Sequence, residues 1–330
     1  MNGITGLGER KVIKIIMEHL EKMPDIPFPY GDDVSAVQID DGTLAVLKTD
    51  MLVGKTDIPS GMSLKQAARK AVVMNVSDFA AKGVRPLIAL ASLGLPKDLN
   101  EKDVEEIGLG LNWGAREYGA YIVGGDTNES SDLIINCSLL GFCKKSTLVK
   151  RGGARPGDIV AVTGLFGKTP AGLKILQECL SVHRRIEKAL LDAVLMPKAR
   201  LWEGLALAES KVLTASIDSS DGLAWSLSEL SDASGVGFII DDVPLAHEAK
   251  EFAEAYGLNP LDLALYGGEE YELVVTVKPQ DWKKAKEVAE GVGAKLTKIG
   301  RATEGREILL KHDEEIKTVE RKGWEHFKTL

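Results

Sequence analysis

The segment from Ser63 to Gly83 carries the pattern that most constrains the fold. Ser63 with Gln66 three residues later is a capping box, which predicts a helix start, and Gly83 is typical of the position after a helix. Between them most side chains are apolar or small. We therefore expect a helix that is buried on most sides inside a layered domain.

Strand patterns surround this helix in the first half of the chain. The predicted strands cover residues 34–39, 43–47, 86–93, 121–123 and 133–141, and further helices are predicted at 9–22 and 101–118. This mixture predicts one α/β or α+β domain.

The segment 144–158 concentrates Lys, Arg, Gly and Pro between two apolar runs, and we place a domain junction there. The second half also mixes strands, at 159–163, 215–217, 236–240 and 271–277, with helices at 171–177, 197–209, 282–292 and from 223 onward. We predict an N-terminal domain at 1–148 and a C-terminal α/β domain at 149–330, which suits a length of 330 residues.

The charge balance bears on the partners of the protein. Its 41 Lys+Arg and 49 Asp+Glu leave a net charge of -8, which argues against nucleic acid or an anionic membrane as partner. No apolar run approaches the ~18–20 residues of a membrane span, and the polar start predicts no secretory signal. Three cysteines (137, 143 and 179), none in a CxxC motif, indicate reduced thiols, so we expect a cytoplasmic protein.

Two glycine patterns imitate phosphate-binding loops without matching them. Gly167-Lys168-Thr169 resembles the end of a P-loop, but Val162 stands where the first glycine belongs and Pro170 interrupts the helix that should follow. The glycines at 108, 110 and 114 miss GxGxxG by one residue and follow a helical pattern. Neither pattern predicts a nucleotide site.

Five aspartate motifs beside small residues are the stronger signal. They are Gly31-Asp32-Asp33, Thr49-Asp50, Ser77-Asp78, Gly124-Gly125-Asp126-Thr127 and Asp218-Ser219-Ser220-Asp221-Gly222. We expect four of the five to end a strand or begin a loop, and the motif at 77–78 to lie inside the helix from Ser63. Each alone is ordinary turn or cap chemistry. Together they favour a site where short carboxylates hold a metal and small neighbours admit a bulky anion.

The chemistry of such a site follows from its charge. Several carboxylates repel a nucleotide phosphate unless divalent cations lie between them, and Mg²⁺ suits this arrangement. Phosphoryl transfer needs mainly positioning and charge neutralisation, so we predict Mg-dependent phosphate chemistry. Asn75 and Asp78 on the buried helix need partners, and a metal is a good one. The alternative is a solvated stripe in which Asp78 pairs with Lys82.

The motifs and their order together carry a family resemblance. They are GDDVSAV (31–37), LAVLKTDMLV (44–53), KAVVMNVSDFAAKGVRP (70–86), VGGDT (123–127), KRGGARPGDIVAVTG (150–164), IDSSDGLAWSL (217–227), GGEEYELVVTV (267–277) and GWEHF (323–327). Nearly end to end, the chain resembles the thiamine-monophosphate kinase family, in the superfamily of aminoimidazole ribonucleotide synthetase. The run VGKTDIP resembles the archaeal branch of that family.

The resemblance implies transfer of the γ-phosphoryl group of ATP onto thiamine monophosphate, giving thiamine diphosphate by direct in-line attack. It implies several Mg²⁺ ions and a two-domain aminoimidazole ribonucleotide synthetase-like fold, whose N-terminal ATP- and Mg-binding domain pairs its sheet with a second copy in a homodimer. The implied metal ligands are Asp33, Thr49 (through its backbone or hydroxyl), Asp50, Asp78, Asp126, Asp218 and Asp221; the ATP contacts are Gly125, Asp126, Arg151 and Ser220; and the substrate contacts are Asp57, Glu269 and Trp324.

Three positions depart from the family pattern. Lys48 stands where many members have Ser or Thr, and a lysine there could itself neutralise phosphate. Asp57 stands where bacterial members have His, although an aspartate cannot donate to phosphate as histidine does. Glu270 replaces an aspartate and displaces its carboxylate by one methylene.

Other functions stay open on the residues alone. Aminoimidazole ribonucleotide synthetase itself shares the superfamily. Selenophosphate synthetase needs a reactive cysteine near the N-terminus and the hydrogenase-maturation dehydratase needs one at the C-terminus, and neither fits this chain. A metal-dependent phosphatase would use the same carboxylates to activate water. A non-catalytic nucleotide-binding module is a further alternative, besides the other enzymes of the superfamily and the phosphatase.

Overall fold

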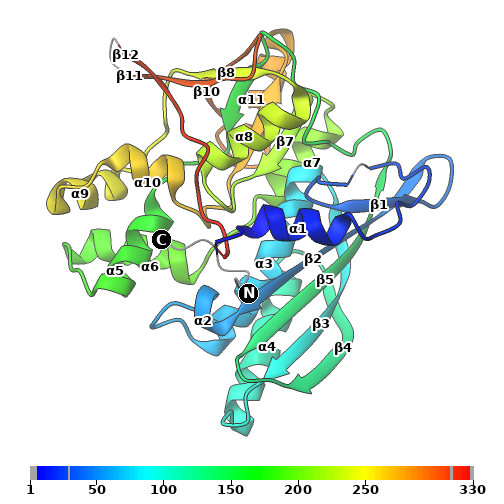
Figure 1. The fold of residues 1–330 in the computed structure, drawn as a ribbon, viewed down its shortest axis with the longest axis vertical. Coiled ribbons are helices and arrows are strands. Elements are labelled where there is room, and N and C mark those ends of the chain that lie inside the picture. Colours follow the sequence, from blue (N-terminus) through cyan, green and yellow to red (C-terminus); the bar gives the residue numbers. More distant parts are fainter. Residues whose placement is uncertain (1–5, 29, 313–314, 328–330) are drawn as a thin grey trace.

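The computed structural model describes residues 6–28, 30–312 and 315–327, and it contains two sheets with helices packed against them (Figure 1). The helices are α1 Glu9–Met17, α2 Gly54–Asp57, α3 Leu64–Lys82, α4 Glu101–Glu117, α5 Lys168–Glu178, α6 Arg184–Leu195, α7 Leu201–Glu209, α8 Leu223–Ser234, α9 His247–Tyr256, α10 Pro260–Tyr266 and α11 Trp282–Gly291. The strands are β1 Ser35–Gln38, β2 Thr43–Val53, β3 Arg85–Leu95, β4 Tyr121–Glu129, β5 Ile134–Lys144, β6 Ile159–Val162, β7 Leu213–Asp218, β8 Gly237–Ile240, β9 Leu273–Val277, β10 Thr297–Thr303, β11 Ile308–His312 and β12 Glu315–Thr318.

The first sheet has the order β1-β2-β5-β3-β4. All its neighbours are antiparallel except β3 and β4, which are parallel and joined through α4. Helix α3 contacts β2, β5 and β3, and α4 contacts α3 and β4, so that both helices cover the same face (Figure 1). No described helix covers the opposite face along its length.

The second sheet has the order β12-β11-β8-β10-β6-β9-β7. Only the pair β11 and β8 is parallel. The short strands β6 and β9 are buried along their whole length, as expected at the centre of a sheet packed on both faces.

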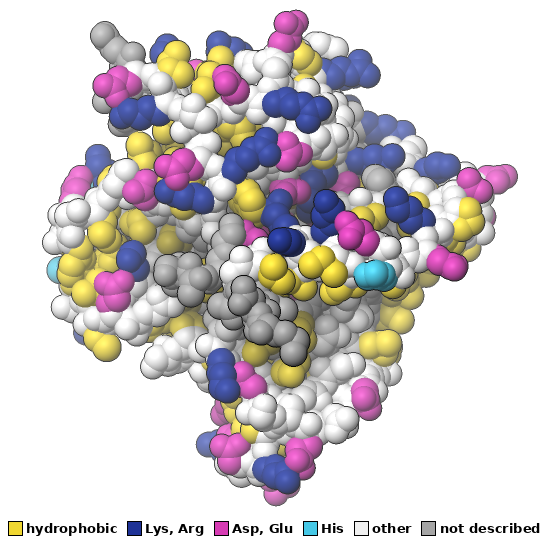
Figure 2. Space-filling view, in the orientation of Figure 1, with side chains coloured by type: hydrophobic (Ala, Val, Ile, Leu, Met, Phe, Trp, Pro, Cys, Tyr) yellow, Lys and Arg dark blue, Asp and Glu magenta, His cyan; other side chains and the backbone are white. Residues whose placement is uncertain are grey.

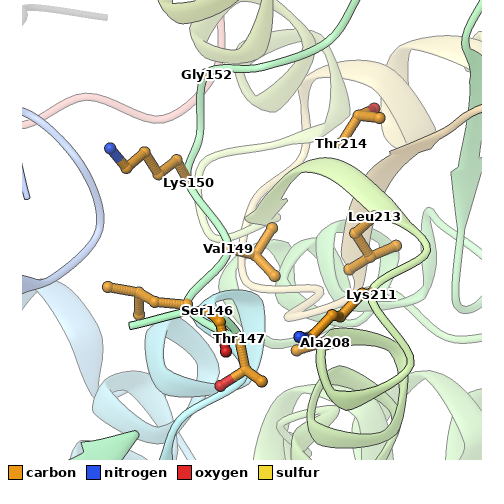
Figure 3. A pocket seen from close by; sticks show the side chains of 10 residues that line it. Ser146, Thr147, Val149, Lys150, Gly152, Ala208, Lys211, Leu213 and Thr214 are labelled. Carbon is orange, nitrogen blue, oxygen red and sulfur yellow. The ribbon is translucent and has the colours of Figure 1, made fainter. Parts of the chain in front are cut away.

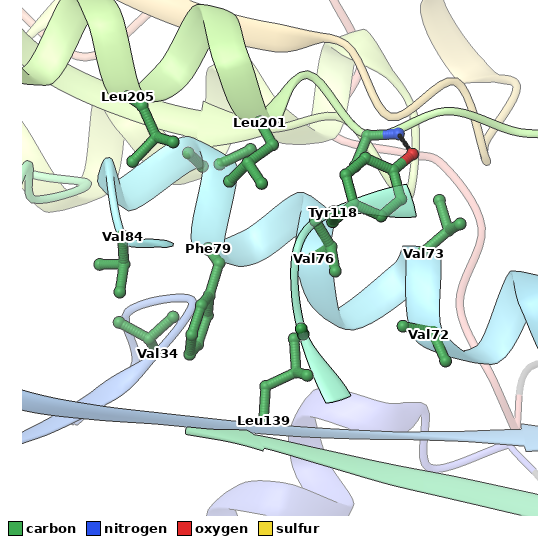
Figure 4. Close-up of a cluster of buried hydrophobic side chains, with 14 of the residues drawn as sticks. Val34, Val72, Val73, Val76, Phe79, Val84, Tyr118, Leu139, Leu201 and Leu205 are labelled. Carbon is green, nitrogen blue, oxygen red and sulfur yellow. Dashed lines mark hydrogen bonds between the residues drawn. The ribbon is translucent and has the colours of Figure 1, made fainter. Parts of the chain in front are cut away.

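Helix α3 joins the two halves through a shared core. Phe79 and Val76 on α3 belong to one buried cluster with Leu139 of β5 and with Leu201 and Leu205 of α7 (Figure 4). The cluster therefore runs from the first sheet through α3 into the helix that precedes β7. This packing places the C-terminal half of α3 beside the end of β7, where the candidate site lies.

The structure confirms the mixed helix-and-sheet fold and differs from several predicted elements. Helix α1 ends at Met17 instead of continuing to residue 22, and β2 and β4 extend six residues beyond their predicted ends. Asp50 and Asp126 consequently lie inside strands, not after them. Helices α6, α9 and α10 and strands β10 to β12 were not predicted, because their short patterns depend on tertiary packing.

Two surface features complete the description. Apolar side chains of α1 (Ile13, Ile15 and Ile16) are exposed, and Figure 2 shows apolar groups along this helix. Within the described part of the chain, no helix combines the length and the apolar character needed to cross a membrane.

Candidate active site

Helix α3 carries the polar side chains around which the site is built. The Ser63 hydroxyl accepts a hydrogen bond from the Gln66 N–H at 3.2 Å, and the Ser63 N–H donates to the Gln66 side chain at 3.0 Å, so the predicted capping box is confirmed. Gly83 follows the helix with φ 67°, a region that favours glycine. Because α3 is buried on most sides, its polar side chains must find partners inside the protein.

Three carboxylates meet beside α3. Asp33 comes from the segment before β1, Asp78 from α3 and Asp218 from the end of β7. All three are buried, and one oxygen of each lies within 4.8 Å of the others. The structure thus brings together three of the seven residues predicted as metal ligands.

The acidities of these groups show how their charges are balanced. Burial raises the pKa of Asp218 to about 6, and the charge of Asp33 adds to this effect. Burial also raises the pKa of Asp78 well above its usual range, although Lys48 opposes the shift. Burial acts on Asp33 as well, but Lys82 and Arg151 hold its pKa below the ordinary value. Added positive charge would therefore stabilise Asp78 and Asp218 in their ionised forms.

Two buried cations hold the segment that carries Asp33. Lys82, fully buried at the end of α3, places its Nζ 2.7 Å from Asp32 and 2.7 Å from Asp33. The Arg151 side chain bonds to Asp33 and donates to Glu229 at 2.6 Å, and its backbone N–H donates to Asp32 at 2.9 Å. Arg151, a predicted ATP contact, therefore lies at the cluster and links it to α8.

Asp50 and Asp221 lie around the three carboxylates. Lys48 Nζ is 3.1 Å from Asp50 Oδ1 and 2.9 Å from Asp78 Oδ2. Asp78 therefore pairs with Lys48. The solvated-stripe alternative, in which Asp78 pairs with Lys82, is wrong. Burial, with Glu9 and Asp218 nearby, raises the pKa of Asp221 to about 7.

Thr49 turns its side chain away from this cluster. It alternates along β2 with Lys48 and Asp50, so its hydroxyl lies on the opposite face of the sheet. That hydroxyl hydrogen-bonds to Ser138 at 2.9 Å and to Asn136 at 3.1 Å on β5. Of the two predicted routes to a metal, the backbone carbonyl is the one compatible with this orientation.

Gly125 and Asp126 lie on the edge strand β4, apart from the three buried carboxylates. The row Met51, Asn136, Ser92 and Asp126 crosses the sheet from β2 to β4, a span of three strand spacings, or about 14 Å. A Cβ at Gly125 would lie 1.7 Å from the Ala91 carbonyl oxygen, so only glycine fits there. The Asp126 side chain is exposed.

Two predicted substrate residues are connected by Lys70, which is not among the predicted site residues. The buried Lys70 Nζ donates to the Asp57 carbonyl oxygen at 2.9 Å and to Glu269 Oε1 at 2.5 Å. The Asp57 carboxylate accepts from the Val53 N–H at 2.7 Å and closes the turn at α2. Its position within a run of mostly apolar residues on a predicted buried helix could have indicated that Lys70 has a buried acidic partner.

The third predicted substrate residue, Trp324, is 47% exposed. Its backbone N–H donates to the Asp221 carbonyl oxygen at 3.1 Å. Ser220, a predicted ATP contact, is exposed on the same loop and accepts at 2.6 Å from the Glu269 N–H. A Cβ at Gly268 would lie 2.6 Å from the Ser220 carbonyl oxygen and 3.6 Å from Trp324 Cβ, which shows how closely these segments pack.

Glu270, the third departure from the family pattern, caps a helix. Its carboxylate accepts from the Gly167 N–H at 2.6 Å and from Thr169 at 3.3 Å, at the start of α5. Burial raises the pKa of Glu270 to about 8. Its carboxylate therefore supports α5 rather than the aspartate cluster.

A separate pocket of about 240 Å³ lies where the two halves of the chain meet (Figure 3). Residues 146–150 line one side, and Lys211, Leu213 and Thr214 line another. None of the predicted site residues lines it.

The chain is similar to known proteins along nearly its whole length. Residues 31–143 match the family "AIR synthase related protein, N-terminal domain", and residues 155–313 match the corresponding C-terminal domain. The chain is 36% identical to the thiamine-monophosphate kinase of Nitrosopumilus maritimus, covering 98% of this chain and 100% of the relative. It is 36% identical to the thiamine-monophosphate kinase of Pyrococcus horikoshii, covering 98% of each.

A solved structure is also similar, AaThiL complexed with AMPPCP and TMP. It has a TM-score of 0.85 and 34% identity, and the match covers 97% of each chain. The fold, the motif order and the near-complete coverage agree, and the chain belongs to the AIR synthase related proteins and, among them, to the thiamine-monophosphate kinase family.

Proposed function

We propose that the protein transfers the γ-phosphoryl group of ATP to thiamine monophosphate, producing ADP and thiamine diphosphate. The observation that carries this proposal is the meeting of buried Asp33, Asp78 and Asp218 with cationic side chains, an arrangement suited to a metal-bound polyphosphate. Relatives of nearly equal length named for this activity support it, as does a related structure with AMPPCP, an ATP analogue, and TMP.

The donor set fits Mg²⁺. Asp33, Asp78 and Asp218 offer only hard oxygen ligands within reach of one another, and burial disfavours the charges of Asp78 and Asp218 in the absence of a metal ion. Bound there, Mg²⁺ would neutralise the phosphate charges and help align the transferred group with its acceptor. Asp50, Asp221 and the Thr49 carbonyl would complete the set of ligands.

The remaining side chains bind and orient the two substrates. Arg151 and Ser220 contact ATP from the C-terminal side of the cluster. Lys70 fixes Glu269 and the Asp57 backbone so that they present one surface to thiamine monophosphate. The exposed Trp324 ring stacks on the aromatic part of that substrate. Because the acceptor is itself a phosphate, no side chain has to remove a proton from a weakly acidic hydroxyl.

The protein acts as a homodimer built on the uncovered face of the first sheet. That face exposes large apolar side chains, as an interface would require: Leu47, Met51, Leu90, Tyr121 and Phe142. In this arrangement the N-terminal domain, 1–148, supplies most of the ATP and metal contacts and the dimer contact. We place the protein in the cytoplasm.

The dimer also explains the position of Asp126. Along the sheet Asp126 lies three strands from β2, about 14 Å, and its exposed side chain is not among the three carboxylates that meet beside α3. We place Gly125 and Asp126 in the active site of the partner subunit, where the edge strand β4 meets the second copy.

Product analysis tests this function. With ATP, Mg²⁺ and thiamine monophosphate, a kinase forms ADP and thiamine diphosphate in equal amounts with little free phosphate. A metal-dependent phosphatase on the same carboxylates would release free phosphate instead. A nucleotide-binding module would show a thermal shift with ATP and Mg²⁺ but no turnover.

A further inference from the structure

Lys48 places a fixed positive charge inside the aspartate cluster. It points from β2 toward α3, its side chain is 20% exposed, and its Nζ lies 3.1 Å from Asp50 and 2.9 Å from Asp78. Its backbone is held by the sheet, since Lys48 pairs with Leu139 of β5 and the preceding Leu47 pairs with Ser35 of β1. The ammonium group is therefore positioned between two of the carboxylates to which the proposed function assigns Mg²⁺.

The other cations of the cluster lie on a different carboxylate. Lys82 and Arg151 both bind Asp33. Among the described residues, the ion pairs of Asp50 and Asp78 are with Lys48. Paired with two carboxylates at these distances, the Lys48 ammonium supplies their balancing positive charge.

We propose that the Lys48 ammonium is a built-in cation of the nucleotide site, which takes the place of one divalent ion between Asp50 and Asp78. This inference deepens the proposed function and rests on it for the identity of the phosphate ligand. In the free protein Lys48 balances charge that would otherwise draw a further Mg²⁺. With ATP bound, the same group faces the phosphate chain.

The size of the effect follows from electrostatics. A divalent ion that shares Asp78 with Lys48 would lie within about 5 Å of the ammonium group and be repelled by it, even with the screening of a partly solvated site. Lysine suits this role because its charge is compact. Removing the ammonium should therefore strengthen Mg²⁺ binding by about ten- to a hundredfold.

Calorimetric titration of the nucleotide-free protein with MgCl₂ tests the proposal. Lys48→Thr and the length-matched Lys48→Met should bind about one more Mg²⁺ per chain than the wild type, with affinity about ten- to a hundredfold higher. Lys48→Arg keeps the charge and should bind Mg²⁺ like the wild type. Lys283→Thr removes an exposed lysine of α11 and should change nothing.

Melting temperatures provide the second readout. In 5–20 mM MgCl₂, on the order of concentrations that saturate weak sites, the Thr and Met variants should gain more thermal stability than the wild type. If Lys48 is only a structural ion-pair partner, both neutral variants will melt lower and bind Mg²⁺ no better. That result would overturn the proposal.

The titration contains neither ATP nor thiamine monophosphate, which separates it from the proposed function. If the neutral variants bind Mg²⁺ more strongly but the wild type makes no thiamine diphosphate, the kinase assignment is wrong and the proposed role of Lys48 stands. If the wild type makes thiamine diphosphate but the neutral variants bind Mg²⁺ no better than it does, the kinase assignment stands and the proposed role of Lys48 is wrong.

Discussion

Ser77 of α3 donates a 2.6 Å hydrogen bond to Oδ2 of Asp218 at the end of β7, and so joins the helix of the first domain to a carboxylate of the second. Both groups are buried. This bond lowers the pKa of Asp218 against the larger effect of burial. It therefore holds in place a carboxylate that we propose as a metal ligand, and it favours the ionised form of that carboxylate.

Ser77→Ala should lower the free energy of unfolding by about 1–3 kcal/mol, because Asp218 loses a buried partner. It should also weaken Mg²⁺ binding severalfold, as measured by calorimetry without nucleotide. Ser228→Ala removes another buried hydroxyl, which donates to the Ala224 carbonyl oxygen at 2.8 Å, and is the matched control. Equal effects of both substitutions on Mg²⁺ binding would show that the Ser77 bond is only structural.

Asp78→Asn and Asp126→Asn should each reduce turnover by a factor of about 100 or more, because each removes a carboxylate proposed to serve the metal-bound phosphates. Their folds should persist, as judged by circular dichroism and melting temperature. Turnover in the wild type should also cease in excess EDTA. Turnover that survives EDTA, or that persists in both variants, contradicts the metal assignment.

Mixed dimers of these two variants locate Asp126. If Asp126 serves the partner's site, a dimer with one copy of each variant has one intact site, and random pairing restores about a quarter of wild-type turnover. If Asp126 serves its own protomer, both sites of every mixed dimer are defective. Coexpression followed by an assay of the unfractionated dimers distinguishes these outcomes.

The partly buried Glu270 makes stability depend on pH. Burial raises its pKa from 4.5 to about 8, so between these values the folded state holds a proton that the unfolded chain has released. Its contribution to the free energy of unfolding is full below pH 4.5 and is lost as the pH rises toward 8, by up to about 1.4 kcal/mol per pH unit.

Glu270→Gln should remove that decline, which urea unfolding between pH 5 and 8 would reveal. Glu304→Gln, at an exposed position, should keep the wild-type slope. Identical slopes for Glu270→Gln and the wild type would show that Glu270 is ionised in the folded protein throughout this range.

Trp324→Ala should raise KM for thiamine monophosphate by about five- to a hundredfold through loss of stacking, and leave KM for ATP unchanged. The exposure of the ring argues against a role as a core anchor. Trp202→Ala, which removes a ring 45% exposed on α7, is the control and should leave both constants unchanged. An unchanged KM for thiamine monophosphate with a lower melting temperature would assign Trp324 to anchoring the chain end.

The sequence predicted the class of fold and the residues of the cluster better than it predicted their partners. The capping box at Ser63 and the glycine at position 83 define α3 through local rules, which operate within a few residues. Asp33, Asp78 and Asp218 carry recognisable motifs. Their meeting depends on contacts between segments more than a hundred residues apart, as the bond from Ser77 to Asp218 shows.

The cationic partners depend on tertiary structure alone. Lys82 lies one helical turn from Asp78, which suggests a pair, yet it points to Asp32 and Asp33. Lys70 is covered by packing and finds Glu269, far away in the sequence. Local spacing predicts pairs on an exposed helix, whereas a buried helix offers its side chains to whichever element covers them.

The most direct measurement follows the terminal phosphoryl group of ATP. The wild type is incubated with γ-³²P-labelled ATP, Mg²⁺ and thiamine monophosphate, and the products are separated. We expect label in thiamine diphosphate in an amount equal to the ADP formed, none in excess EDTA, and less by a factor of about 100 or more with Asp78→Asn. Label that appears instead as inorganic phosphate, or ADP formation that does not depend on thiamine monophosphate, would contradict the proposed function.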